Sequence, residues 1–100
     1  MSFELKGKTA IVTGAANGIG LAIAKHFADI GVNVMMADMD EEKLGQEAGE
    51  IGTNAVKYFA GDLRQKLTIA NLLSATIDSF DRIDILVNAS RQVLPSNAHD

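Results

Sequence analysis

Three glycines lie in a short segment whose spacing suits the binding of a phosphate group. Residues 13–20 read Thr-Gly-Ala-Ala-Asn-Gly-Ile-Gly. Glycines adopt backbone angles that are closed to other residues, and the missing Cβ atoms let a phosphate approach the main chain. A helix that begins at such a turn offers free N–H groups and a positive dipole end to a pyrophosphate. The turn predicts a dinucleotide site formed by Gly14, Asn17, Gly18, Ile19 and Gly20.

An ordinary tight turn is the alternative interpretation of these glycines. A strand before the turn and a helix after it favour the phosphate-binding interpretation. No Lys-Ser/Thr pair follows Gly20, so the segment is not an ATP-type phosphate loop.

Asp38 is the second residue whose side chain could bind a ligand. Asp38 stands 18 residues beyond Gly20, at the end of an apolar run. In a dinucleotide-binding fold, an acid here accepts hydrogen bonds from the adenosine ribose hydroxyls. It also repels a 2′-phosphate, so it predicts NAD in preference to NADP. The alternative is that Asp38 caps the next helix, although Asp40 stands closer to that helix start.

A third signal is the pair Asp62-Leu63, which follows the third apolar run. At the carboxyl end of a parallel strand, Asp62 could accept a hydrogen bond from the adenine amino group, and Leu63 could pack on the ring. The alternative role for Asp62 is to cap a helix that begins near Gln65. The two roles can coexist.

The elements that must position these residues alternate along the chain. β-branched and apolar runs predict strands at 9–13, 32–37, 55–60 and 83–87. Helical periodicity predicts helices at 18–30, 41–50 and 65–80. Strands that alternate with helices imply parallel pairing. We therefore predict an α/β fold, a Rossmann-like doubly wound parallel sheet with the order βαβαβαβ.

Two of the helices carry apolar residues that we expect to be buried. In the first helix these are Ile19, Ile23, Phe27 and Ile30. In the third helix they are Ile69, Leu72, Leu73, Thr76, Ile77 and Phe80.

Composition excludes several classes of function. The net charge of −4, without a cluster of basic residues, argues against nucleic-acid binding. Cysteine is absent, which excludes disulfides and zinc–thiolate sites, and we predict no metal site. No apolar run approaches the ~20 residues of a membrane span, so we expect no membrane partner and a cytoplasmic location.

Together these motifs resemble the short-chain dehydrogenase/reductase family. Residues 13–20 match its Thr-Gly-x-x-x-Gly-x-Gly motif, and Asp62-Leu63 falls at its adenine-contact position. Residues 84–89 resemble the strand that leads to its Asn-Asn-Ala-Gly motif, which adds Asn88 to the expected cofactor contacts. The resemblance implies hydride transfer between NAD(H) and a small carbonyl or alcohol substrate. It also implies a homo-oligomer, either a dimer or a tetramer.

The resemblance also implies which parts of the site are not here. Residues 1–100 would form the N-terminal half of one dinucleotide-binding domain, with the last residues in the loop after the fourth strand. The family's serine and its Tyr-x-x-x-Lys pair would lie beyond residue 100, so we expect no catalytic residue in this segment. Tyr58 lacks a lysine four positions later, and His26 and His99 have no partner that would make them catalytic.

One stretch departs from the family pattern. After Asn88 the chain continues Ala89-Ser90-Arg91, which places Arg91 where the family has a glycine. This puts the contacts near the nicotinamide-side ribose in question and supports one alternative, a non-catalytic NAD(H)-binding module. A different α/β nucleotide-binding protein is a third possibility, which the glycine spacing and Asp38 disfavour.

Overall fold

A computed structural model describes residues 4–89 of the chain. Strands and helices alternate along it as β1 (Thr9–Thr13), α1 (Gly18–Asp29), β2 (Asn33–Asp38), α2 (Glu41–Ile51), β3 (Val56–Ala60), α3 (Lys66–Phe80) and β4 (Ile85–Asn88). The predicted order is confirmed, and every boundary lies within two residues of its predicted position. No helix in the described part of the chain has the length and apolar character needed to cross a membrane.

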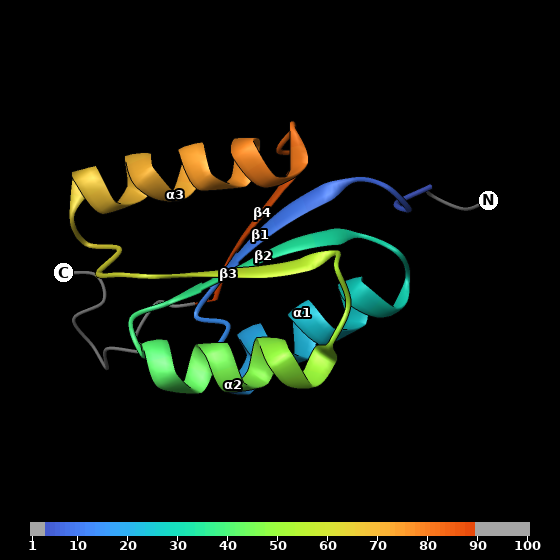
Figure 1. Ribbon diagram of the computed structural model, residues 1–100, viewed down its shortest axis with the longest axis horizontal. Coiled ribbons are helices and arrows are strands. Elements are labelled where there is room, and N and C mark those ends of the chain that lie inside the picture. The colour runs from blue at the N-terminus through green and yellow to red at the C-terminus, as the bar shows by residue number, and fades with distance from the viewer. Residues whose placement is uncertain (1–3, 90–100) are drawn as a thin grey trace, which may run out of the picture.

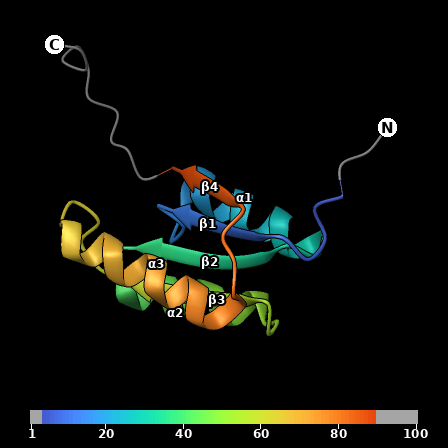
Figure 2. The same ribbon diagram turned by 90° about the horizontal axis from the view of Figure 1, so that it is seen from above.

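The four strands form one parallel sheet in the order β3-β2-β1-β4. Helices α1 and α2 cover one face and α3 covers the other (Figures 1 and 2). The predicted Rossmann-like doubly wound α/β fold is therefore confirmed. After β3 the chain crosses back over the sheet to place β4 beside β1. Strand order reverses at that point, and open parallel sheets bind their ligands where it does so.

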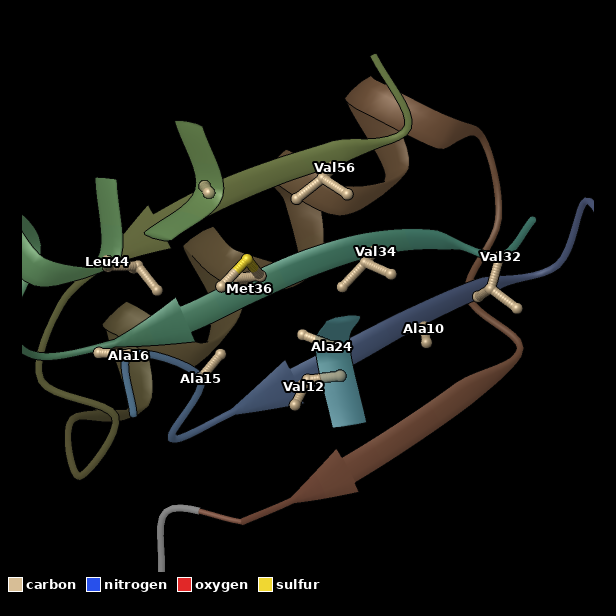
Figure 3. Close-up of a cluster of buried hydrophobic side chains, with 11 residues drawn as sticks. Ala10, Val12, Ala15, Ala16, Ala24, Val32, Val34, Met36, Leu44 and Val56 are labelled. Atoms are coloured by element: carbon tan, nitrogen blue, oxygen red, sulfur yellow. The ribbon is translucent and has the colours of Figure 1, made fainter. Parts of the chain in front are cut away.

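Two apolar layers hold the helices on the sheet. On the face covered by α1 and α2, Val12, Val34 and Met36 of the strands pack with Ala24 and Leu44 of the helices (Figure 3). On the opposite face, Ile11, Met35, Ala37 and Leu72 form the second buried cluster. Consecutive residues of β1 and β2 thus point into different layers. This double coverage is why their sequences are continuous apolar runs instead of alternating ones.

Burial is less complete than the sequence predicts. On α3 only Leu72 and Thr76 are buried, while Ile69, Leu73 and Ile77 are each more than 40% exposed. The contacts of α3 with the sheet are mainly to β2 and β3, and its second apolar flank stays exposed. The edge strands β3 and β4 are likewise only partly buried.

The prediction for the ends of the first helix was also wrong. Ile19 is 75% exposed and Ile30 is 39% exposed. Ile19 belongs to the first turn of α1, and Ile30 follows the last turn as the C-cap residue.

The strand register brings the polar residues together. Thr13, at the end of β1, lies opposite Ala37 of β2 and Asn88 of β4. Asp38 ends β2 opposite Ala60, the last residue of β3. The carboxyl ends of all four strands therefore meet at one edge, where the glycine turn also lies.

Candidate functional site

A cleft of about 670 Å³ opens at the carboxyl edge of the sheet. All the predicted site residues line it except Gly20 and Asn88. The lining residues are Gly14, Asn17, Gly18, Ile19, Asp38, Met39, Gly61, Asp62, Leu63, Arg64 and Ala89. The structure thus brings the three separate sequence signals into one cavity.

Gly14 and Gly18 give the turn its shape. Their φ angles are 68° and 63°, in the left-handed region that favours glycine. A Cβ atom on Gly18 would meet no other atom within 4 Å. Gly18 also lines the cleft, so the missing side chain leaves its backbone open to a ligand.

Gly20 has a different place in the same turn. A Cβ atom there would overlap the Gly14 carbonyl oxygen and come within 2.7 Å of the carbonyl carbon. Gly20 is buried and lies outside the cleft lining. Its missing side chain allows α1 to pack closely on the end of β1.

The N-terminus of α1 faces the cleft through Asn17, Gly18 and Ile19. Asn17 is the N-cap residue, but its side chain makes no capping hydrogen bond, and the first turn of α1 contains no acidic residue. Among the described residues, no side chain therefore competes for the first amide groups of this helix. Such an end carries partial positive charge and attracts an anion.

The Asp38 carboxylate joins the end of β2 to the glycine turn. Its Oδ2 accepts a hydrogen bond from the backbone N–H of Ala16 at 3.1 Å, and its Oδ1 accepts one from the N–H of Asp40 at 3.1 Å. The cap of α2 is Asp40, which accepts from the N–H of Lys43 at 3.1 Å. The helix-cap alternative for Asp38 is therefore wrong, and ribose binding stays a prediction.

Asp62 is held by a residue that the sequence analysis did not select. The Arg64 guanidinium donates to the Asp62 carboxylate from Nε to Oδ1 and from Nη2 to Oδ2, both at 3.0 Å. The backbone N–H of Arg64 also donates to Oδ1 at 3.0 Å. These hydrogen bonds, the side-chain ones first, lower the pKa of Asp62 from 3.8 to about 2.

The capping alternative for Asp62 is wrong as well. The N-cap of α3 is Gln65, which has no side-chain capping hydrogen bond. Gln65 instead donates its backbone N–H to the Asp62 carbonyl oxygen at 3.0 Å. The Asp62 carboxylate is turned toward Arg64, and both residues line the cleft.

Asn88 lies at the strand-order reversal, between β1 and β4. Its Oδ1 accepts a hydrogen bond from the Thr13 hydroxyl at 2.9 Å. This contact ties the end of β4 to the start of the glycine turn, and Ala89 lines the cleft next to it. Ser90, Arg91 and His99 lie outside the described residues.

Four residues of the cleft were missed from the predicted site, namely Met39, Gly61, Ala89 and Arg64. Met39 directly follows Asp38, and Gly61 directly precedes Asp62. Their positions at the ends of the second and third strands could have identified them. Gly61 also donates its N–H to the Asp38 carbonyl oxygen at 3.0 Å, which brings the ends of β2 and β3 together. The only sequence signal for Arg64 was its position two residues after Asp62. In an Asx turn, an aspartate side chain accepts a hydrogen bond from the backbone two residues on.

The remaining polar candidates lie elsewhere. Tyr58 is on β3, and its hydroxyl lies 3.1 Å from the Cβ position of Gly45 on α2. His26 is exposed on α1. Within residues 4–89, no three His, Cys, Asp or Glu side chains are grouped so that they could hold a metal ion.

The lowered pKa of Asp62 makes a testable prediction. We expect this carboxylate to stay ionised until the pH falls through about 2, so that the ion pair with Arg64 is complete above pH 4. In the Arg64→Ala variant the pKa should rise toward 3.8 but stay below it, because the backbone N–H at position 64 remains. NMR titration of the Asp62 carboxyl carbon measures both values. An unchanged pKa in the variant would contradict the pairing.

Comparison with known proteins supports this arrangement. The sequence profile of the short chain dehydrogenase family matches residues 8–98. An uncharacterized oxidoreductase of Staphylococcus epidermidis is 39% identical over 97 residues, which cover 97% of this chain and 42% of the relative. An uncharacterized oxidoreductase of Staphylococcus saprophyticus is 38% identical over 96 residues, or 93% of this chain and 41% of that protein. The chain thus spans about two fifths of the length of these relatives.

Solved structures show the same fold at recognisable sequence identity. The 3-ketoacyl-(acyl-carrier-protein) reductase of Brucella melitensis, in complex with NADH, matches with a TM-score of 0.79 and 36% identity over 82% of this chain and 34% of its own. A short chain dehydrogenase/reductase of Burkholderia phymatum, in complex with NAD, matches with a TM-score of 0.81 and 30% identity over 85% of this chain and 31% of its own. The profile match over most of the chain, together with these structural matches, shows that the chain belongs to the short-chain dehydrogenase/reductase family.

Proposed function

We propose that the cleft binds NAD(H) and that the chain supplies the cofactor site of an oxidoreductase. The observation that carries this proposal is the open space beside Gly18, at a helix end that has no side-chain cap. The backbone of Gly14, Asn17 and Gly18 would hold the pyrophosphate. Asp38 lines the same cleft and would accept hydrogen bonds from the adenosine ribose. The NADH and NAD complexes of the two solved relatives support this choice of ligand.

The adenine would lie at the third strand end. Leu63 offers an apolar surface for the ring, and Asp62 offers a carboxylate oxygen to the 6-amino group. Met39 lines the same cleft and is 59% exposed, which gives the base a second apolar neighbour. Asn88 would contact the cofactor near the strand-order reversal between β1 and β4.

The bound nicotinamide supplies the hydride acceptor or donor for interconversion of an alcohol and a carbonyl compound. The residues of this chain bind and orient the cofactor. Groups that act on the substrate would come from a further segment, because this chain would be the N-terminal half of the domain. The alternative, a non-catalytic NAD(H)-binding module, depends on residues 89–91, and only Ala89 of these is described.

Asp38 makes the cofactor choice testable. We expect the intact protein to bind NADH more tightly than NADPH by about 1–3 kcal/mol, because a carboxylate accepts from a diol and repels a phosphate. Within residues 4–89, Arg64 is the one basic side chain in the cleft lining, and it is already paired with Asp62. Titrations with NADH and NADPH measure the preference.

The informative variant is Asp38→Asn. Its amide oxygen can still accept from the N–H of Ala16, so the turn keeps one hydrogen bond while the charge is removed. The preference for NADH should shrink. Asp29→Asn, which removes the same charge from an exposed position at the end of α1, should leave the preference unchanged. A wild-type protein that prefers NADPH would overturn the assignment of NAD.

A further inference from the structure

The Asp62–Arg64 ion pair is unusual for its place in the molecule. Three ion pairs join described residues, and this is the one whose two members both line the cleft. The side chain of Arg64 is 82% exposed, whereas that of Asp62 is 29% exposed. An isolated pair this exposed contributes little to stability. The main effect of the pair is therefore on the orientation of the Asp62 carboxylate and not on the free energy of unfolding.

The Arg64 donors restrain the orientation of the Asp62 carboxylate. Two parallel N–H···O bonds from a planar guanidinium fix both the position and the plane of a carboxylate. The backbone N–H of Arg64 adds a third donor on Oδ1. Arg64 thus places two donors on Oδ1 and one on Oδ2, which leaves more acceptor capacity on Oδ2. An aspartate without these contacts would sample several rotamers on the wall of the cleft.

The chemical state of Asp62 follows from the same contacts. With its pKa lowered to about 2, this carboxylate is ionised at every pH at which the protein would work. An ionised carboxylate accepts hydrogen bonds and donates none. It therefore favours a ligand group with N–H donors and repels a carbonyl oxygen at the same position.

We infer that Arg64 is a positioning residue, which holds the Asp62 carboxylate as an oriented acceptor and so makes the cleft select a 6-amino purine over a 6-oxo purine. This inference rests on the proposed binding of NAD(H). The effect of Arg64 acts through Asp62, without a contact of its own to the base. Arg64 thereby contributes to base recognition although its own charge is paired with that of Asp62.

The test compares NADH with its hypoxanthine analogue, in which a 6-oxo group replaces the 6-amino group. Both are titrated against the intact protein at neutral pH. We expect the wild type to bind NADH about tenfold more tightly than the analogue, as one hydrogen bond to a charged group allows. Asp62→Ala should bind the two dinucleotides equally. Arg64→Ala should retain only about a threefold preference, because its Asp62 carboxylate loses both guanidinium donors and keeps only the backbone N–H of residue 64.

A matched control is available in the same chain. Arg82 and Asp84 form a pair of the same spacing, with Nε and Nη2 bonds of 2.7 and 2.8 Å, just before β4 and outside the cleft lining. Arg82→Ala should therefore leave the ratio of the two affinities unchanged. The double variant Asp62→Ala/Arg64→Ala should match Asp62→Ala, because Arg64 has no route to the base except through Asp62.

The ratio separates the possible outcomes. If the role of Arg64 is merely structural, Arg64→Ala will lower the affinities for both dinucleotides by the same factor. The ratio of the two affinities will then be unchanged, which would overturn the inference while the proposed function stands. Equal binding of both dinucleotides by the wild type would overturn it in the same way. If the wild type binds neither dinucleotide, the proposed function fails and the inference fails with it.

Discussion

Replacement of Gly18 by valine is expected to lower the affinity for NADH at least ~100-fold, which corresponds to about 2.7 kcal/mol. The side chain would occupy the open space of the cleft and keep the pyrophosphate away from the backbone. Valine at a φ of 63° is also strained, at a cost of about 1–3 kcal/mol in stability. Titration of the folded variant with NADH, below its melting temperature, measures the binding effect alone.

Gly7→Val is the matched control for the strain. Gly7 has a φ of 85° and no atom within 4 Å of its Cβ position, but it is not among the cleft residues. We expect it to lose stability like Gly18→Val and to bind NADH like the wild type. If Gly18→Val also keeps wild-type affinity, the pyrophosphate does not bind at this turn.

The largest effect on stability is expected from Gly20→Ala. The added methyl group would overlap the Gly14 carbonyl, and a backbone group cannot move aside as a flexible side chain can. We expect the free energy of unfolding to fall by about 3 kcal/mol, at the upper end of the usual range for overpacking. Chemical denaturation of the intact protein, followed by circular dichroism, measures the loss.

Gly49→Ala provides the comparison within a helix. Gly49 lies in α2, with nothing within 4 Å of its Cβ position. Alanine there should stabilise the protein by about 0.5–1 kcal/mol, because it reduces the entropy of the unfolded chain and favours the helix. Two glycine-to-alanine changes in helices should thus have opposite signs. Equal stability of Gly20→Ala and the wild type would show that α1 does not approach β1 as closely as described.

Local patterns in the sequence were enough to predict the fold. Apolar runs of five or six residues specify strands that are covered on both faces, and helical spacing specifies the segments between them. Alternation of the two implies parallel pairing, and parallel strands place their carboxyl ends at one edge. Residues that follow different strands, such as Gly14, Asp38 and Asp62, were therefore expected to meet, and they line one cleft.

The prediction of buried residues was wrong where burial depends on elements that are distant in the sequence. The apolar periodicity of α3 identifies which residues could be buried, but it does not show how much of that stripe the sheet reaches. Leu72 is 3% exposed, and Leu73, on the adjacent flank, is 42% exposed. The difference arises from the position of the helix over β2 and β3, which the sequence of α3 does not encode locally.

The sequence by itself determined the α/β architecture, the glycine turn and most of the residues that line the cleft, because periodicity and glycine spacing are local properties. Only the tertiary structure decided what Gly18 and Gly20 do. They are chemically identical and two positions apart, but one borders open space and the other packs against backbone. It also decided that Asp38 binds the amide of Ala16 and that Asp62 pairs with Arg64. Hydrogen-bond partners depend on which groups come close together in space. A local sequence pattern restricts the possible pairs but does not determine which of them form.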